Sequence, residues 1–584
     1  MMDSYISRIV TACFFKSALE VREYLEDHCS VSSAPCLSCA CDDEMIRKII
    51  DYVDDNYLNY HGITELAGLP SPIIKQFQTD SIDRMYYDPC SRLYSKDIYY
   101  PCHEKKTADP EYLLEFLKEI SDVDQDKYCL DDYFQIIWGV FEDYVSMISA
   151  NGGNSSLFEL TKLRAGLATA LYFYSGGKGF SFDVALKDFV ISCSFDFLGI
   201  KDFKFRSENS TNLRKETAAS LYVDLLRENV LDEFMSELGI SRCNLVFSGG
   251  RHIHMFLPNT ESVLKKIDVF IRSLNDWLVK KTGDTVFVSY GSCALDSLKH
   301  DEVRGDDYYL NIFTKIANHK ALMESHRYSV DQIEYMNSCK YGNLLDLDVM
   351  SNSFTNEKYY VVTDIKKENS IEILEGRHLY ASDTADYLDA LRVYRSNHLV
   401  SRKIVPAVEI WHQKLYEGGA DLCKAGFYLI RLDIDGFNLH MLGNQTCNIS
   451  PNEKMELSKH FSFFLKRDVT LLSDILSNKD NCICMIHEGA DDLFILVSEN
   501  ILIKFVKELV LHYEKFTGGS LSFSAGISEF DPKYGFSYNC AMAQHLMDCA
   551  KKNPGKNSVV IKSESVLMKW KDFIANVENI ETVF

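Results

Sequence analysis

The sequence has little that would suit a secreted or membrane-bound protein. It contains no long apolar run, and its first residues lack the apolar core and cleavage site of a signal peptide. We therefore predict a cytoplasmic protein that does not engage a membrane. Positive charge is also scarce, because 62 lysines and arginines stand against 85 aspartates and glutamates and leave a net charge of −23. A general basic surface for nucleic acid is therefore not expected.

Cysteine is present without the regular spacing of a disulfide framework. The 18 cysteines are scattered along the chain, which in a reducing compartment predicts buried thiols. One cluster could hold zinc, although the second clear Cys-X2-Cys pair of the usual structural zinc sites is missing. The members of this cluster are Cys29, Cys36, Cys39 and Cys41.

The length of the chain predicts several modules. At 584 residues it is too long for one core, and its 46% hydrophobic and 12% aromatic content is that of an ordinary folded protein. Roughly three to five modules are expected. The first, residues 1–178, is predicted to be helical because apolar residues recur at three- and four-residue spacing. This pattern covers residues 46–53, 110–120, 130–149 and 157–174.

Two acidic motifs near the C-terminal end organise the rest of the chain. A predicted strand starting at residue 427 ends in Asp433-Ile434-Asp435, and the two aspartates share one face because side chains alternate along a strand. A predicted hairpin follows, with β-rich residues at 482–487 and 493–497. Its turn contains Gly489, Ala490, Asp491 and Asp492.

If the hairpin lies beside the strand, Asp433, Asp491 and Asp492 meet at one edge of a sheet. Carboxylate oxygens are the ligands that Mg²⁺ and Mn²⁺ prefer, and a pair of such ions suits phosphoryl transfer. Aspartate is common at turns, so either motif alone is better interpreted as structural. The helical stretch at 452–476 between the motifs favours a shared site.

The order of predicted elements occurs twice. After the hairpin come a helix at 501–516, a strand at 521–528 and a helix at 539–552, which begins as the β-α-β-β-α-β order of the ferredoxin-like split unit. The same order is predicted upstream, which indicates an internal repeat and an α+β fold with two ferredoxin-like palm domains. The upstream elements span residues 188–196, 213–238, 244–257, 261–280 and 285–290.

Short motifs in both copies resemble one known family. The second-copy motifs are Asp433-Ile434-Asp435, Gly489-Ala490-Asp491-Asp492, Ser524-Ala525-Gly526-Ile527, Ala550-Lys551 and Gly555-Lys556-Asn557. They resemble the GGDEF and palm cyclase superfamily. Residues 450–458, before a Phe-Phe-containing helix, resemble the large polymerase-cyclase subunit of type III-A CRISPR effector complexes, the Csm type. In the first copy, residues 196–203, 213–214, 248–250 and 257–259 resemble the first palm of that family.

The resemblance implies a catalytic second palm that binds ATP. Asp433, Asp491 and Asp492 are the predicted catalytic residues, and together with the Ile434 carbonyl they would hold two Mg²⁺ or Mn²⁺ ions. Asp492 is either a ligand of the second ion or the acceptor of the hydroxyl proton, and Asp435 is either a further acid of the site or a residue that orients the loop. The predicted ATP-contacting residues here are Gly436, Phe437, Gly489, Ala490, Lys551, Lys552 and Lys556.

The first palm is predicted to assist without catalysing. Arg251 and His252 follow its glycine turn where the second palm has Asp491 and Asp492, so it cannot supply the same metal cradle. The resemblance implies that its Ser248-Gly249-Gly250 turn holds a second nucleotide, since backbone N–H groups of a glycine-rich turn can approach phosphate closely. The alternative is an ordinary glycine hairpin.

Other regions depart from the family pattern. The family often carries a metal-dependent HD nuclease at its start, but the His-Asp dipeptide of this chain is His300-Asp301, and Glu159-Leu160 stands where the family usually has Asp-His. We expect a degenerate HD-like domain without nuclease activity. The family's four-cysteine zinc element is expected to be lost, because the linker offers only Cys339. The predicted divisions are 1–178, helical; 179–300, first palm; 301–410, helical linker; 411–565, second palm; and 566–584, short tail.

The functional hypothesis is a large subunit that converts ATP into cyclic oligoadenylates when its complex binds target RNA. Its expected partners are other type III CRISPR subunits and a guide RNA, with the target RNA held mainly by those partners. The family usually continues into a C-terminal helical domain soon after Lys556-Asn557, which leaves docking of this chain in a complex open. The alternatives are a self-standing cyclic dinucleotide synthase and a catalytically decayed scaffold.

Overall fold

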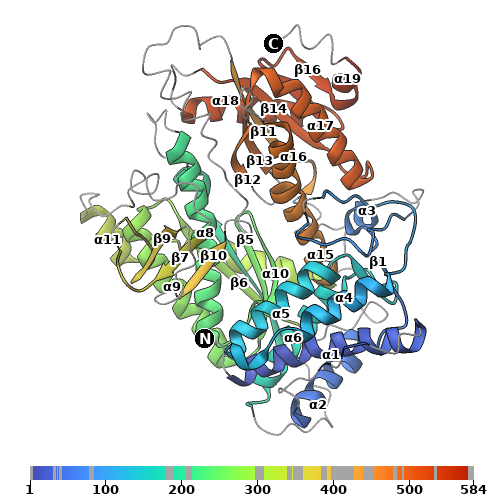
Figure 1. Cartoon of the computed structure of the whole chain (residues 1–584). Coiled ribbons are helices and arrows are strands. Elements are labelled where there is room, and N and C mark those ends of the chain that lie inside the picture. Colours follow the sequence, from blue (N-terminus) through green and yellow to red (C-terminus); the bar gives the residue numbers. More distant parts are fainter. Residues whose placement is uncertain are drawn as a thin grey trace.

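The structure is a computed structural model with helical and mixed α/β parts. Figure 1 shows the N-terminal helices at one end of the molecule, the C-terminal sheet at the other and the first palm beside the N-terminal helices. Among the residues that the structure describes, no helix is long and apolar enough to cross a membrane. Those residues are 4–29, 34–35, 37, 43–77, 84–95, 97–177, 188–204, 213–295, 308–338, 345, 359–367, 369–382, 391–395, 426–437, 451–477, 483–488, 492–531, 534 and 536–576.

The N-terminal part is mainly helical, as the apolar spacing predicts. Helix α6 is buried on all sides, and its fully buried Arg164 places Nε 2.8 Å from Asp54 Oδ1. The helix predicted at 130–149 ends earlier, because residues 148–150 form β2 and satisfy their backbone groups by antiparallel pairing with β1. The elements are α1 (Ser4–His28), α2 (Glu44–Val53), β1 (Leu66–Gly68), α3 (Pro72–Phe77), α4 (Pro110–Ser121), α5 (Leu130–Val145), β2 (Ile148–Ala150) and α6 (Leu157–Tyr174).

The first palm has the predicted β-α-β-β-α-β order. Its antiparallel sheet runs β4-β5-β3-β6, and α8 and α9 contribute to one core with it. The elements are β3 (Val190–Leu198), α7 (Ile200–Lys204), α8 (Leu213–Leu238), β4 (Leu245–Gly249), β5 (His252–Pro258), α9 (Glu261–Thr282) and β6 (Phe287–Leu295).

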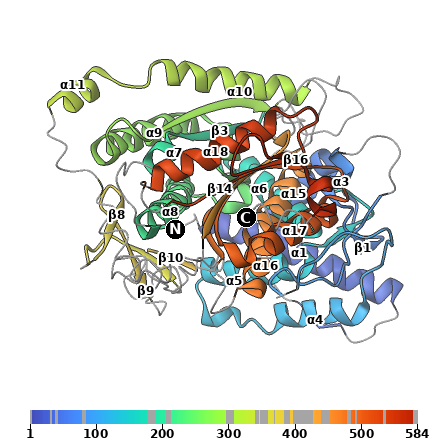
Figure 2. The same ribbon diagram turned by 90° about the horizontal axis from the view of Figure 1, so that it is seen from above.

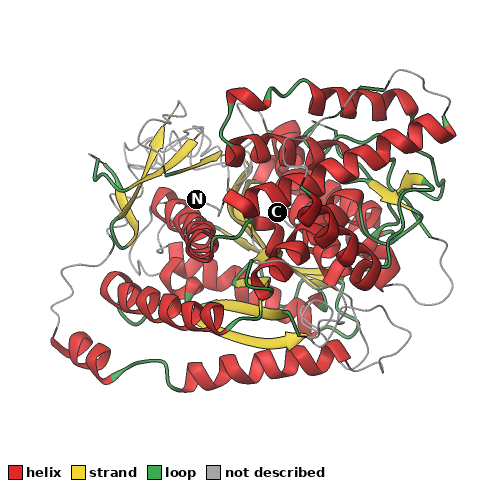
Figure 3. Ribbon diagram, turned by 90° about the horizontal axis from the view of Figure 1, so that it is seen from below, coloured by secondary structure: helices red, strands yellow, loops and turns green. Residues whose placement is uncertain are grey.

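The linker after the first palm is not wholly helical, so that part of the prediction is wrong. It begins with α10 (Tyr308–Ser325) and α11 (Val330–Ser338) and then forms a four-stranded antiparallel sheet in the order β10-β7-β9-β8. Figures 2 and 3 show this sheet as a separate group of strands on the α8 side of the first palm. Its apolar residues complete the first-palm core, which only the tertiary contacts reveal. The strands are β7 (Tyr359–Thr363), β8 (Ile371–Leu374), β9 (Arg377–Ser382) and β10 (Arg392–Arg395).

The second palm repeats the first and extends it. Its sheet runs β12-β13-β11-β14-β15-β16, so the four strands β12-β13-β11-β14 correspond to β4-β5-β3-β6. A π-helical turn, Phe463–Asp468, joins α15 to α16. The elements are β11 (Phe427–Ile434), α15 (Pro451–Ser462), α16 (Val469–Leu476), β12 (Ile483–Glu488), β13 (Asp492–Ser498), α17 (Glu499–Thr517), β14 (Phe523–Glu529), α18 (Phe536–Lys552), β15 (Ser558–Ile561), β16 (Leu567–Lys569) and α19 (Trp570–Ala575).

The segment predicted as a tail from residue 566 is in part a portion of the second palm. Strand β16 pairs with β15, and α19 buries Trp570 and Phe573 in the palm core. Trp570 Nε1 also donates to the Phe523 carbonyl oxygen at 2.8 Å. The large apolar surface of these two side chains explains why the segment packs against the sheet.

Helix α15 is the place where the N-terminal domain and the two palms meet. It packs against β4, α3 and α6. Glu456 of α15 is fully buried and accepts a hydrogen bond from the Ser156 backbone N–H at 2.5 Å, while Lys459 lies 2.8 Å from Glu456. These polar contacts and the surrounding apolar packing fix the second palm against the rest of the chain.

Candidate active site

Two carboxylates of the second palm lie side by side in the sheet. Strands β11 and β13 are antiparallel, and their register places Asp433 opposite Asp492. Both side chains are largely shielded from water. The predicted convergence is therefore confirmed for this pair, whereas Gly489, Ala490 and Asp491 lie outside the described residues.

Each carboxylate is balanced by a cation of the same domain. Lys551, in the last turn of α18, forms an ion pair with Asp433, and Arg431 forms one with Asp492. Arg431 is two residues before Asp433 on β11 and therefore shares its face. Burial raises the pKa of Asp433 above its ordinary value; the Lys551 charge opposes this shift, and the nearby Asp492 adds to it. The site thus concentrates negative charge that needs cationic partners.

The close packing of α18 on the sheet places Lys551 at this site. Gly526 of β14 lies against the helix backbone, where an added Cβ would come within 2.3 Å of Met547 N and 2.4 Å of Ala543 O. Only glycine permits this approach. Of the other predicted lysines, Lys552 is exposed, and Lys556 occupies the turn after α18 with a φ of 46°.

Asp435 orients the loop that follows β11. Its carboxylate accepts hydrogen bonds from Ser522 Oγ at 2.7 Å, Ser524 Oγ at 2.9 Å and the Asn557 backbone N–H at 2.9 Å. These bonds tie the end of β11 to β14 and to the turn after α18. Gly436 follows with a φ of 79°, and Phe437 is buried.

The donor set fits a hard divalent cation. Asp433 and Asp492 offer neighbouring carboxylate oxygens, and Ile434, whose carbonyl is a predicted additional ligand, is the last residue of β11. Mg²⁺ and Mn²⁺ favour carboxylate, carbonyl and water oxygens. The pairing of both acids with Lys551 and Arg431 shows that positive charge is favourable at this position.

The first palm holds a different group at the corresponding position. Its register places Asp196 of β3 opposite His252 of β5, as Asp433 lies opposite Asp492. His252 Nδ1 and Lys320 Nζ lie 2.7 and 2.9 Å from Asp196 Oδ1. Burial acts to raise the pKa of Asp196, but His252 and Lys320 outweigh it and hold this pKa at about 2. A histidine and a lysine thus replace the second acid.

Sequence reasoning did not identify Asp196, Lys320 or Arg431 as parts of these sites. Asp196 lies two residues before the end of β3, and Asp433 lies one residue before the end of the corresponding strand β11, so alignment of the two repeats would have singled out Asp196. An arginine inside an apolar strand was the available signal for Arg431. Lys320 lies on the linker helix α10, and only tertiary packing reveals its role.

A small cavity joins the glycine turn of the first palm to the second palm. Gly250 has a φ of 56°, and Arg227 donates to its carbonyl oxygen at 2.8 Å. Ser248 donates through Oγ to Glu228 at 3.2 Å. The cavity is lined by Phe247, Ser248, Gly249, Phe437, Ser458, Phe461, Ser462 and Lys466. The predicted residues Ser248, Gly249 and Phe437 therefore line the same cavity.

The N-terminal stretch that departs from the family pattern has a structural position. Glu159 is buried, and its carboxylate lies 2.9 Å from Lys162 Nζ and 3.9 Å from Lys459 Nζ. These contacts connect α6 to α15 of the second palm. The dipeptide His300-Asp301 and the cysteines Cys36, Cys39 and Cys41 lie outside the described residues, as does Cys339.

Comparison with known proteins finds a family model over each of the two repeated sheets. Residues 190–339 match the family model for Csm1 subunit domain B, and residues 427–560 match that for the second palm domain of Cas10/Cmr2. Two curated relatives are named CRISPR system single-strand-specific deoxyribonuclease Cas10/Csm1 of subtype III-A. The Mycobacterium tuberculosis relative is 25% identical, over 76% of this chain and 65% of its own. The Enterococcus italicus relative is 26% identical, over 66% of this chain and 55% of its own.

Solved structures show the same fold. A Csm1–Csm4 subcomplex of the type III-A interference complex matches with a TM-score of 0.74 at 16% identity, covering 98% of this chain and 86% of that chain. Csm1–Csm4 cassettes in complex with cA4 and with one ATP match with TM-scores of 0.70 at 14% and 0.71 at 15% identity, each covering 98% of this chain and 86% of that chain. The predicted resemblance is confirmed by these matches. The chain spans less than two thirds of the length of the curated relatives.

Proposed function

Since this chain belongs with the Cas10/Csm1 large subunits of type III-A CRISPR systems, we propose that its second palm converts ATP into cyclic oligoadenylates. The observation that carries the proposal is the pairing of Asp433 with Asp492 on adjacent strands of a palm. The fold relatives include Csm1–Csm4 cassettes bound to ATP and to cA4, which supports the choice of nucleotide and product.

The proposed reaction is attack of one ribose 3′-hydroxyl on the α-phosphate of a neighbouring ATP. Asp433, Asp491 and Asp492, with the Ile434 carbonyl, would hold two Mg²⁺ or Mn²⁺ ions. When bound, such ions favour deprotonation of the hydroxyl, neutralise the phosphate and stabilise the departing pyrophosphate. Asp492 would either complete the ligands of the second ion or receive the hydroxyl proton.

In this proposal Lys551, which now pairs with Asp433, also binds the triphosphate of ATP. Bound metal ions would compete with Lys551 and Arg431 for the carboxylates, which frees Lys551 to bind a triphosphate oxygen. Lys551 lies in the last turn of α18 and forms an ion pair with Asp433. Lys556 lies in the following turn and would contribute positive charge for the same phosphates.

The second nucleotide is proposed to lie between the palms. Ser248 and Gly249 of the first palm share a cavity with Phe437 of the loop after Asp435. Backbone N–H groups of the Ser248-Gly249-Gly250 turn would approach its phosphates. Because His252 stands opposite Asp196 where the second palm has a second acid, the first palm is proposed to bind nucleotide without catalysing transfer.

We further propose that the chain works with other type III subunits, including a Csm4-type partner, and with a guide RNA. Target RNA would act as the activator and would be held mainly by those partners, since the chain carries a net charge of −23. No nuclease activity is proposed, although the curated relatives are named single-strand-specific deoxyribonucleases; an assay with single-stranded DNA tests this point.

The function is tested by mass spectrometry of products formed from ATP with Mg²⁺ or Mn²⁺. The protein is assayed alone and in its guide complex with target RNA, beside the double variant Asp491→Ala/Asp492→Ala. Cyclic oligoadenylates that require target RNA and vanish in the variant support the proposal. A cyclic dinucleotide made by the lone protein would favour a self-standing synthase, and absence of any nucleotide product would favour a scaffold.

A further inference from the structure

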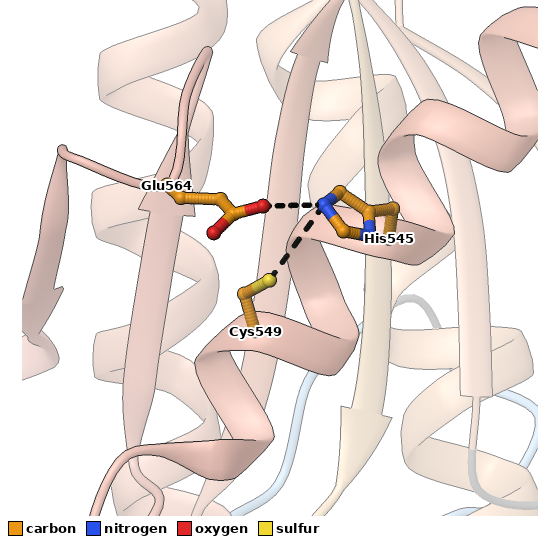
Figure 4. A group of neighbouring side chains, drawn as sticks. All are labelled: His545, Cys549 and Glu564. Atoms are coloured by element: carbon orange, nitrogen blue, oxygen red, sulfur yellow. Dashed lines mark hydrogen bonds and ion pairs between the residues drawn. The ribbon is translucent and has the colours of Figure 1, made fainter.

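A second cluster of metal-ligating side chains lies on the surface of the second palm. His545 Nε2 is 2.7 Å from Glu564 Oε1 and 3.9 Å from Cys549 Sγ. All three ligand atoms lie within 4.8 Å of one another. Figure 4 shows the three side chains pointing toward a common centre. Among the described residues, this is the one group of three or more histidine, cysteine or acidic side chains with such spacing.

The secondary structure accounts for this arrangement. His545 and Cys549 are four residues apart on α18, so they lie one turn apart on the same face of the helix. Glu564 belongs to the turn between β15 and β16. Strand β15 pairs with β14, and α18 packs against both strands. Helix α18 and the β15–β16 turn thus bring the three ligands together.

We propose that His545, Cys549 and Glu564 form a site for a divalent transition metal of the zinc class. One imidazole nitrogen, one thiolate sulfur and one carboxylate oxygen are all zinc ligands, and the sulfur disfavours Mg²⁺ and Ca²⁺. Three protein ligands leave a fourth position open to water or another ligand. The site therefore differs in chemistry from the all-oxygen pair of Asp433 and Asp492.

The present distances are close to those that such an ion requires. Tetrahedral bonds of about 2.0 Å to nitrogen and oxygen and about 2.3 Å to sulfur place the ligand atoms roughly 3.3 to 3.6 Å apart. The His545 to Glu564 distance of 2.7 Å would widen and the His545 to Cys549 distance of 3.9 Å would shorten. Small side-chain rotations achieve both changes. The metal would replace the hydrogen that joins Nε2 to Glu564.

Solvent access allows an ion to enter and leave. The side chains of His545 and Glu564 are 51% and 65% exposed, and Cys549 is half-buried. An ion at this position would tie α18 to the β15–β16 turn, and α18 carries Lys551 two residues after Cys549. The inference does not depend on the proposed cyclase activity, because the ligands lie outside the Asp433–Asp492 pair.

Metal binding by the full-length protein tests the proposal. Purified wild-type protein is stripped with a chelator and titrated with Zn²⁺, and bound zinc is counted by elemental analysis after dialysis. Titration with Co²⁺ adds a signature, because cobalt bound to a thiolate absorbs in the near ultraviolet. Cys549→Ser and His545→Ala remove ligands, whereas Asp548→Asn changes an exposed acid on the same helix outside the cluster.

Wild type and Asp548→Asn are expected to bind one more zinc ion than Cys549→Ser. If Cys549→Ser still binds that ion, its affinity is expected to be at least about tenfold lower than that of wild type. The thiolate absorption of cobalt is expected to fall in Cys549→Ser. Equal thermal unfolding of all variants in chelator shows that the substitutions leave the fold intact. Equal metal binding by wild type and Cys549→Ser overturns the proposal. The double variant Cys36→Ser/Cys39→Ser removes two members of the N-terminal cysteine cluster, and zinc that is lost only in this variant also overturns the proposal.

Discussion

Asp433 and Asp492 lie opposite each other on the antiparallel strands β11 and β13, each paired with a cation of the same domain. The corresponding strands of the first palm place Asp196 opposite His252. One register thus holds two acids in the second palm and an acid with a base in the first. This difference is the basis of our proposal that metal chemistry belongs to the second palm and that the first palm binds nucleotide without transferring it.

Replacing Asp492 by asparagine is expected to abolish most nucleotide transfer while keeping the side-chain shape. Loss of the carboxylate should lower the rate at least about 100-fold, as for other groups that stabilise charge in a transition state. Product formation from ATP is measured by chromatography at saturating metal. Asp548→Asn makes the same change at an exposed position of α18 and should leave the rate unchanged. Comparable rates for wild type and Asp492→Asn would contradict the assignment.

Replacing Lys551 by glutamine is expected to move the acid limb of the pH–rate profile to higher pH. Burial already raises the pKa of Asp433, and Lys551 opposes that rise. Without Lys551 the pKa rises further, so the carboxylate becomes protonated at a higher pH and ceases to bind cations there. Lys504→Gln makes the same change at an exposed position of α17; it is the control and should keep the wild-type profile. Identical acid limbs in both variants would refute a role for Lys551 beside Asp433.

Replacing Gly250 by alanine is expected to lower nucleotide transfer through the first palm. Gly250 and Gly376 both occupy hairpin turns, with φ values of 56° and 70°. Alanine at either position should cost about 1 kcal/mol of unfolding free energy. Of these two glycines, only Gly250 belongs to the Ser248-Gly249-Gly250 turn, whose Ser248 and Gly249 line a cavity together with Phe437. Urea unfolding should therefore show similar losses for the two variants, and an ATP titration should show an increased KM for Gly250→Ala alone. Equal KM values would argue for an ordinary glycine hairpin.

Replacing Asp196 by asparagine is expected to destabilise the protein at neutral pH. The pKa of Asp196 is lowered from 3.8 to about 2. The charged carboxylate therefore stabilises the fold at pH values above its pKa in the unfolded chain. This stabilisation is lost as the pH falls through the pKa of the folded protein. The shift corresponds to about 2 to 3 kcal/mol. The unfolding free energies of wild type and variant, measured with urea, should differ by this amount near neutral pH. The difference should shrink as the pH is lowered toward about 3. A constant difference would show that the ionised carboxylate is not its source.

The two palms and the acidic pair could be predicted because they depend on local patterns. Alternation of side chains predicted a shared face for Asp433 and Asp435, although β11 ends at Ile434. The predicted hairpin contains β13, which brings Asp492 beside Asp433. The repeated β-α-β-β-α-β order identified both sheets. The same reasoning failed for the linker, where β7 to β10 form a sheet that completes the core of the first palm.

By itself, the sequence determined the order of the elements within the two palms, the acids of the second palm and the loss of a second acid in the first. Only the tertiary structure decided which cations face those acids, since Lys551 and Lys320 come from helices 118 and 124 residues away from their partners. It also decided that Ser248 meets Phe437 and that Glu564 meets His545. Periodicity reports how one segment exposes its own faces, whereas partners distant in the chain are selected by packing of the whole domain.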